Sequence, residues 1–401
     1  MCLAASSMES PGDIDLMLAT LLYRAPLHLK DILRFNLVCS SEERHRTHSS
    51  ASTSKIPSAQ RQSLVRGYSL RAPKTSQPRC RQMACHAYGG RDATVELALD
   101  ISAVLGEGPT WLDEQKRLAF VDIEGKRIHI WDPVSDELDT ISTEAVGRPS
   151  TLTPSREGNF LVVAIEQSVY LVDIQKKKVG EKLAEVPYEL QRPCRFNDGK
   201  ASPVGTLVVG TMHDKWVEGE PAQMFKLGGK PMGPHSLEQV MTEDELMMGN
   251  GLVWTEDMKS MWHCDTTTNC INEWRCDRDG APARGEDGKL DRLNQICIPK
   301  EEGSPDGMTN DAEGNLWVAL FGGSAIACYS PQTGEQLRKV HIPVEKVTCP
   351  IFGGAELDTI YVTTAKIGLD DIPGAGGIFA VKIPGIKGKC PAYTANVAIR
   401  D

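Results

Sequence analysis

A sixfold repetition between Glu107 and Cys349 is the feature of this sequence that most restricts its fold. Successive repeats open at steps of 41, 49, 53, 56 and 43 residues, in most cases beside Gly or Pro. In chain order the openings begin at Glu107, Arg148, Asn197, Asn250, Asp306 and Cys349. Repeats of about 40 to 50 residues that contain several strands are typical of β-propellers. The sequence therefore predicts an all-β, six-bladed propeller.

A short β-rich run follows each opening, in most cases after a turn signal. The runs are residues 118–122, 160–164, 207–211, 261–265, 316–320 and 360–364. Outer strands are expected from the alternation of apolar and polar residues at 126–132, 168–173, 270–275 and 325–330. Blade three is interrupted between residues 213 and 221, and the polar, Gly-rich stretch 282–292 is expected on the surface.

A propeller must join its first and last blades. Residues 94–100 alternate apolar and polar, which predicts a strand just before the first repeat. A ring with one loose blade would leave sheet edges open, so we expect this strand to pair near residues 378–383 and to complete the sixth blade. Residues 368–377 then form a loop inside that blade.

The charge of the 401 residues is distributed unevenly. Residues 1–92 carry 13 Lys/Arg and 7 Asp/Glu, a net charge of +6, whereas the rest has a net charge of −16. An acidic body argues against nucleic acid as a partner, since phosphate binding needs a basic surface. No apolar run approaches the ~20 residues of a membrane-spanning helix, so no membrane partner is expected. We expect a monomer.

Three segments follow from this pattern: a basic, Ser/Arg-rich extension at 1–92, a propeller at 93–390 and a tail at 391–401. We expect the extension to be unfolded by itself. Residues 44–91 contain no acidic residue, which is typical of an organelle transit peptide. A disordered tail, or a wrongly extended gene model with Met83 as a later start, explains the same composition. The expected location is the cytoplasm, or an organelle if the extension is a transit peptide.

The twelve cysteines form no Cys-x-x-Cys pair. A chain of this size with a real core does not need a disulfide framework. We therefore expect buried free thiols in a reducing compartment.

Polar residues at the openings predict a site, because equivalent residues of every blade point at one common axis. Glu107, Asn250 and Asp306 would bring two carboxylates and one amide oxygen together there. Such oxygen ligands suit a hard divalent cation, which would also offset the repulsion between the carboxylates. Asn-Gly and Asp-Gly are also common turn dipeptides, so solvated turn residues are the alternative interpretation.

Arg195 and Asn197 are expected at the same inner edge, where they could hold an anionic or hydroxyl-rich ligand. Alternatively, Arg195 screens the acidic residues and Asn197 fixes a turn. Arg148 could serve like Arg195, and His263 is expected to be a packed strand histidine. The sequence has no Gly-x-Ser-x-Gly elbow and no phosphate-binding loop, so any catalysis would depend on the cation.

Several motifs, taken in order, resemble the signatures of the gluconolactonase/regucalcin (senescence marker protein) family between about residues 100 and 385. They are Leu105-Gly-Glu-Gly-Pro-Thr-Trp, Arg195-Phe-Asn-Asp-Gly-Lys, Gly210-Thr-Met, Asn250-Gly-Leu-Val-Trp, Pro305-Asp-Gly-Met and Gly314-Asn-Leu-Trp-Val-Ala. The resemblance implies a six-bladed propeller with one divalent cation (Ca²⁺, Zn²⁺, Mg²⁺ or Mn²⁺) in its central channel. It also implies the hydrolysis of small-molecule sugar lactones.

Carried over by position, the resemblance implies that Glu107, Asn250 and Asp306 are the metal ligands and that Asp306 is also the general base. It implies that Arg195 and Asn197 hold the lactone's hydroxyls. The chain departs from the family after Gly210-Thr-Met, where some members carry an acidic residue that touches the sugar and this chain reads His-Asp-Lys215. Our first hypothesis is a metal-dependent sugar lactonase. The alternatives are a calcium-binding regulatory propeller without turnover, and a lactonase or phosphotriesterase of different specificity.

Overall fold

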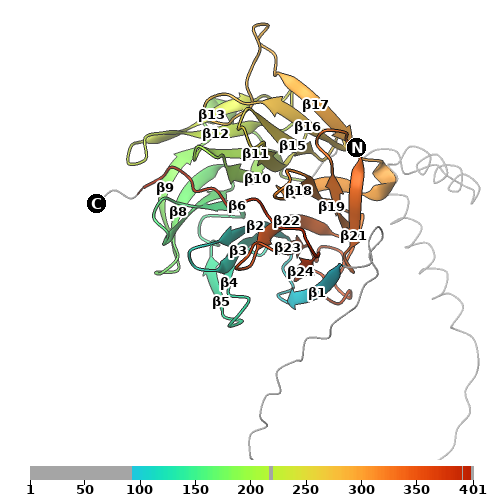
Figure 1. Ribbon diagram of the computed structural model, residues 1–401. Helices are drawn as coiled ribbons and strands as arrows, with labels where there is room; N and C mark the ends of the chain where they lie inside the picture. The colour runs from blue at the N-terminus through green and yellow to red at the C-terminus, as the bar shows by residue number, and fades with distance from the viewer. Residues whose placement is uncertain (1–92, 216–219, 391, 399–401) are drawn as a thin grey trace, which may run out of the picture. The chain divides into compact units, whose positions relative to one another are not determined.

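The computed structural model describes residues 93–215, 220–390 and 392–398. Six four-stranded antiparallel sheets are arranged around a common axis, which confirms the predicted six-bladed propeller (Figure 1). The predicted extension 1–92 lies outside the described residues, as do 391 and 399–401 of the predicted tail. Among the described residues, no helix is long and apolar enough to cross a membrane.

Five blades are each built from four consecutive strands, from the innermost outward. Blade one consists of β2 (Gly106–Leu112), β3 (Arg117–Asp122), β4 (Arg127–Trp131) and β5 (Leu138–Ser142). Blade two consists of β6 (Pro149–Pro154), β7 (Phe160–Ile165), β8 (Ser168–Asp173) and β9 (Lys178–Glu185). Blade three consists of β10 (Cys194–Ala201), β11 (Leu207–His213), β12 (Met224–Gly229) and β13 (His235–Met241). Blade four consists of β14 (Gly249–Trp254), β15 (Ser260–Asp265), β16 (Cys270–Arg275) and β17 (Arg292–Cys297). Blade five consists of β18 (Ser304–Asn310), β19 (Leu316–Phe321), β20 (Ala325–Tyr329) and β21 (Gln336–His341). The described residues also form the short 3₁₀ helices η2 (Tyr188–Leu190) and η3 (Lys300–Glu302).

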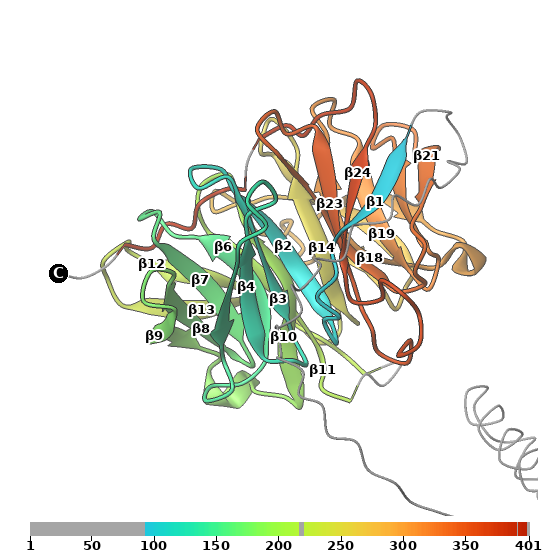
Figure 2. The ribbon, with the colours of Figure 1, turned by 90° about the horizontal axis from the view of Figure 1, so that it is seen from below.

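The sixth blade joins the two ends of the propeller, as predicted. It contains β22 (Val347–Gly353), β23 (Thr359–Thr364), β24 (Ile378–Lys382) and, at its outer edge, β1 (Thr94–Leu99). Thr94 pairs with Lys382 and Glu96 with Ala380, and β1 lies alongside β24 in Figure 2. Residues 365–377 connect β23 to β24 without a strand, so the predicted loop at 368–377 is confirmed. The first strand thus covers an edge that would otherwise be open.

The predicted β-rich runs correspond to the second strand of each blade, not to the innermost one. The openings themselves form most of the innermost strands, which the sequence did not reveal as strands. The reason is a bulge in each innermost strand. A bulge interrupts the alternation of side chains from which a strand is recognised, and glycines at these positions weaken the signal further.

The apolar core is divided among the interfaces between neighbouring blades. Six clusters of buried side chains fill the six interfaces. Trp111, Trp262 and Trp317 are at most 2% exposed, and cutting such a side chain to Ala costs about 3 to 5 kcal/mol. Ala395 and Val397, close to the C-terminus, are buried in the cluster between blades two and three. The residues of 392–398 therefore contribute to the core of the ring.

The expectation of free thiols throughout is wrong at one place. Cys270 and Cys297 form a disulfide between the adjacent strands β16 and β17, where the register places them directly opposite one another. Sequence spacing alone does not show this pairing, because 26 residues with a surface hairpin separate the two cysteines. Among the described residues, Cys194, Cys264, Cys328 and Cys349 are free and buried, as expected.

Candidate functional site

The bulges of the innermost strands set the direction of the candidate site residues. The pairing of innermost and second strand skips two residues in blades three, four and five, and these skips begin at Asn197, Asn250 and Asp306. In blade one, Glu107 is the last paired residue before the same kind of skip. Bulges of this type re-aim side chains next to binding sites. The four residues therefore lie at the bulge of their blade's innermost strand or directly before it.

Glycines beside these residues let the innermost strands approach one another closely. A Cβ at Gly307 would lie 2.3 Å from the Cys349 sulfur, and one at Gly251 would lie 2.4 Å from the Met308 nitrogen. Neither space can hold a side chain. The Asn-Gly and Asp-Gly pairs are therefore required by close packing inside strands, and the interpretation as solvated turns does not apply to them.

One cavity of about 240 Å³ brings all five predicted site residues together. Its lining consists of Leu105, Glu107, Glu124, Arg195, Asn197, Met212, Asp214, Lys215, Met248, Asn250, Thr266, Asp306, Phe321 and Ile367. We call it the site cavity. Glu107, Asn250 and Asp306 are 6%, 3% and 5% exposed, so the two carboxyl groups are almost completely removed from water.

Burial and mutual repulsion act together on the acidic groups. Burial raises the pKa of Glu107 well above its usual value, and the charges of Asp306 and Asp198 raise it further. Burial likewise raises the pKa of Asp306, again with a contribution from Asp198, while Asn250 and Arg195 lower it in part. The pKa of Asp198 is also raised by burial. Arg195 and Lys200 compensate the three buried carboxyl groups only in part, and this arrangement favours either protons or a bound cation at the site.

Two buried oxygens in this region have no hydrogen-bond partner among the described residues: Oδ1 of Asn250 and Oδ2 of Asp198. Buried acceptors rarely remain without a partner, so such atoms indicate an additional ligand. Carboxylate and amide oxygens fit a hard divalent cation. Within the described residues, no three His, Cys, Asp or Glu side chains converge as a metal-binding group. A cation would therefore depend on the Asn250 amide oxygen and on water in addition to Glu107 and Asp306.

Arg195 and Asn197 form one unit on the wall of the site cavity. Nη1 of Arg195 donates to the Phe196 carbonyl at 2.9 Å and to Oδ1 of Asn197 at 2.8 Å. Nδ2 of Asn197 donates to the Gly249 carbonyl at 3.0 Å. Asn197 thus orients the guanidinium, which has further N–H donors for a ligand. Burial lowers the pKa of Arg195, with a contribution from Arg148, while Glu124 and Glu107 oppose this effect.

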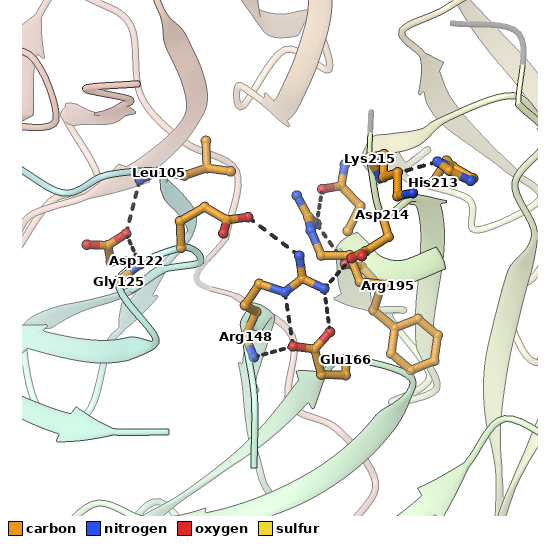
Figure 3. Close-up of polar contacts among 12 residues, drawn as sticks. Leu105, Asp122, Gly125, Arg148, Glu166, Arg195, His213, Asp214 and Lys215 are labelled. Atoms are coloured by element: carbon orange, nitrogen blue, oxygen red, sulfur yellow. Dashed lines mark hydrogen bonds and ion pairs between the residues drawn. The ribbon is translucent and has the colours of Figure 1, made fainter. Parts of the chain in front are cut away.

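Arg148 does not take the place at the axis that its opening predicted. It precedes β6, and the bulged residue of that strand is Ser150. Its guanidinium instead contacts three carboxylates, two of which, those of Glu166 and Asp214, are labelled in Figure 3. It binds Glu166 through two bonds of 3.0 and 2.8 Å, contacts Asp214, and lies 3.8 Å from Glu124. The bonds to Glu166 raise the pKa of Arg148. Arg148 therefore holds two carboxylates that line the site cavity.

Asp214 and Lys215 both line the site cavity. The departure from the family pattern after Gly210-Thr-Met therefore does not remove acidity from this wall, because Asp214 supplies a carboxylate next to Lys215. The sequence motif contains both residues, but the contact between Asp214 and Arg148 joins blades two and three and cannot be read from either segment alone.

Two further expectations concern single residues. In blade six the bulge falls at Thr348, one residue before the predicted opening at Cys349. The Thr348 hydroxyl donates to the Gly106 carbonyl at 2.6 Å. Cys349 packs against Gly307 instead. His263 is 1% exposed, and burial lowers its pKa to about 3, so it is a neutral, packed strand histidine as predicted.

Comparison with known proteins shows the family of this chain. Residues 105–366 match the family model described as the SMP-30/gluconolactonase/LRE-like region. The chain belongs to this family. Regucalcin of Xenopus laevis is 31% identical over 311 residues, which cover 75% of this chain and 98% of that protein. A Bacillus subtilis protein named provisionally as sugar lactone lactonase YvrE is 32% identical over 301 residues, covering 73% and 95% of the two chains.

Solved structures extend the likeness to the fold of family members. The structure of a luciferin-regenerating enzyme matches with a TM-score of 0.64 at 28% identity, covering 76% of this chain and 99% of that one. A calcium-binding protein, regucalcin, of Agrobacterium tumefaciens matches with a TM-score of 0.65 at 23% identity, covering 75% and 97%. The second match is evidence for the shared fold only.

Proposed function

We propose that this protein is a metal-dependent hydrolase that opens a sugar lactone. The observation that carries the proposal is the site cavity, where the bulged innermost strands of three blades bring together two buried carboxyl groups and an amide oxygen that has no hydrogen-bond partner among the described residues. The name of the family and that of the Bacillus subtilis relative support lactone hydrolysis as the reaction.

Glu107, Asn250 and Asp306 are the residues that would hold the cation. When bound, a divalent cation supplies Lewis-acid polarisation of the lactone carbonyl and lowers the pKa of water. Asp306 accepts a proton from the attacking water as general base, since its carboxyl group lines the same cavity as the other two proposed ligands.

Arg195 binds the substrate with the N–H donors that Asn197 and the Phe196 carbonyl leave free. Asp214 and Glu124 line the same cavity and accept hydrogen bonds from substrate hydroxyls. The apolar side chains of Met212, Met248 and Phe321 exclude water from the rest of the cavity, which strengthens these polar contacts.

A calcium-binding protein without turnover is the second candidate. It is favoured by the name of the regucalcin relatives and by the same acidic cavity. The two functions differ in a single respect, which is whether a bound cation is accompanied by hydrolysis.

The test uses the full-length chain, treated with a chelator and assayed for hydrolysis of D-glucono-δ-lactone before and after addition of Mn²⁺, Zn²⁺, Mg²⁺ or Ca²⁺. We expect activity to return with at least one cation. Asp306→Asn should then lower kcat by about 10²- to 10⁴-fold, as expected for loss of a general base. Glu335→Gln, an exposed change in the same blade, is the matched control and should leave kcat unchanged.

Two results would contradict the proposal: full activity in the chelated protein, or near-normal kcat in Asp306→Asn. Cation binding without hydrolysis of any sugar lactone tested would favour the calcium-binding candidate.

A further inference from the structure

Thr266 begins the turn between β15 and β16 and lies beside two of the proposed metal ligands. Its hydroxyl oxygen receives a hydrogen bond from Nδ2 of Asn250 at 2.8 Å. The same oxygen donates to the carbonyl of Pro305, also at 2.8 Å. Pro305 directly precedes Asp306, so one hydroxyl group links the inner strands of blades four and five.

The direction of these two hydrogen bonds is fixed by the number of protons. A hydroxyl has a single proton, and the carbonyl of Pro305 can only accept, so the Thr266 proton is used there. Only lone pairs of Oγ1 then face Asn250. Asn250 must present its NH₂ group to Thr266, because the flipped amide would place two acceptors together with no proton between them.

This orientation decides which atom Asn250 directs away from Thr266. The atom is Oδ1, which is buried and has no partner among the described residues. The side chain of Asn250 is 3% exposed and lines the site cavity together with Thr266 and Asp306. An amide nitrogen at the same place could not bind a cation.

The turn that carries Thr266 is held firmly on both sides. The carboxylate of Asp265 accepts from the backbone nitrogen of Met248 at 3.2 Å. The Asn269 side chain donates to the carbonyls of Ile298 and Gly303, at 2.8 and 3.2 Å. The Cys270–Cys297 disulfide follows directly. Thr266 therefore has little freedom to move when Asn250 or Asp306 binds a ligand.

We propose that Thr266 is a positioning residue that fixes the amide of Asn250, so that Oδ1 faces the site cavity and is available to a divalent cation. The role in cation binding rests on the proposed function, whereas the fixed orientation of the amide does not.

The experiment compares Thr266→Val, which keeps the shape and removes the hydroxyl, with Thr266→Ser, which keeps the hydroxyl. Thr153→Val is the matched control, since the Thr153 hydroxyl also donates to a backbone carbonyl, that of Tyr393 at 2.8 Å, but does not line the site cavity. Each full-length protein is titrated with Mn²⁺ by calorimetry after chelation. Hydrogen exchange of the Asn250 side-chain amide is followed by NMR, with Asn250→Asp identifying the signal.

We expect Thr266→Val to weaken Mn²⁺ binding by about 10- to 100-fold, the usual effect of removing a group that orients a metal ligand. Thr266→Ser and Thr153→Val should bind Mn²⁺ like the wild type. The Asn250 amide protons should exchange slowly in the wild type and in Thr266→Ser, and rapidly in Thr266→Val.

The proposal is overturned if Thr266→Val keeps both the slow amide exchange and the wild-type Mn²⁺ affinity, or if Thr153→Val weakens binding as much. If the wild type itself binds no Mn²⁺, the proposed function fails. Amide exchange still decides the orientation in that case: loss of protection in Thr266→Val supports it, and unchanged protection refutes it.

Discussion

Replacing Glu107 by Gln tests whether the carboxyl group in the site cavity costs stability when no cation is bound. Glu107 is 6% exposed, and its hydrogen-bond partner is the Gly108 backbone nitrogen at 3.2 Å. Burial raises its pKa above 4.5, followed by the effects of Asp306 and Asp198. The folded state therefore binds a proton more tightly than the unfolded state. This contribution to stability is fully present below about pH 4.5 and is lost as the pH rises through the folded-state pKa.

The size of the effect follows from this linkage. Between the two pKa values, each pH unit removes about 1.4 kcal/mol from the free energy of unfolding. The described part of the chain has about 300 residues, and an unfolding entropy of about 2.1 cal/mol/K per residue converts 1.4 kcal/mol into a Tm change of about 2 °C. Gln cannot ionise and also relieves the repulsion on Asp306. The Tm of chelated Glu107→Gln should therefore fall less steeply with pH than that of the chelated wild type.

A cation should reverse the comparison. At a concentration 100 times the Kd, binding adds about 2.7 kcal/mol to the wild type, or about 4 °C in Tm, and little to Glu107→Gln. Scanning calorimetry from pH 5 to 8, with chelator and with Mn²⁺, measures both effects. Equal pH slopes in the two chelated proteins would show that the buried Glu107 carboxyl group does not cost stability, and equal Tm gains with Mn²⁺ would show that it does not bind the cation.

Two other changes probe contacts that hold the site and the fold. Arg148→Met removes the guanidinium that binds Asp214 and Glu166. Because a charged hydrogen bond contributes about 1.5 to 3 kcal/mol, KM for the lactone should rise roughly tenfold in steady-state kinetics while kcat changes less. Arg192→Met, which removes a surface ion pair, should leave KM unchanged. Replacing both Cys270 and Cys297 by Ser opens a loop with a sequence separation of 27. The free energy of unfolding, measured in urea without reductant, should fall by about 3.5 kcal/mol. Cys276→Ser is the control, and an unchanged urea midpoint in the double variant would contradict the disulfide.

Much of the ring could be predicted from the sequence because its information is local. The β-rich runs 118–122 and 316–320 alternate or cluster apolar residues within a few positions, and they became strands β3 and β19. The pairing of β1 with β24 was also predictable, since a closed ring leaves one place for a strand that precedes the first repeat.

What the sequence did not show depends on contacts between blades. The bulge of β6 falls at Ser150, two residues after Arg148, and the bulge of β22 falls at Thr348, one residue before Cys349. The hydrogen bond between Thr266 and Pro305 joins segments about forty residues apart, and it fixes the Asn250 amide only because the same hydroxyl also accepts from Nδ2 of Asn250. No periodicity in the sequence encodes such contacts.

The metal ligands themselves are tested most directly by anomalous diffraction from crystals of the full-length protein grown with Mn²⁺. We predict one anomalous peak in the site cavity, about 2.0 to 2.6 Å from a Glu107 oxygen, Oδ1 of Asn250 and an Asp306 oxygen, as for hard divalent cations. A cavity without a peak, or a peak whose ligands exclude these three oxygens, would contradict it.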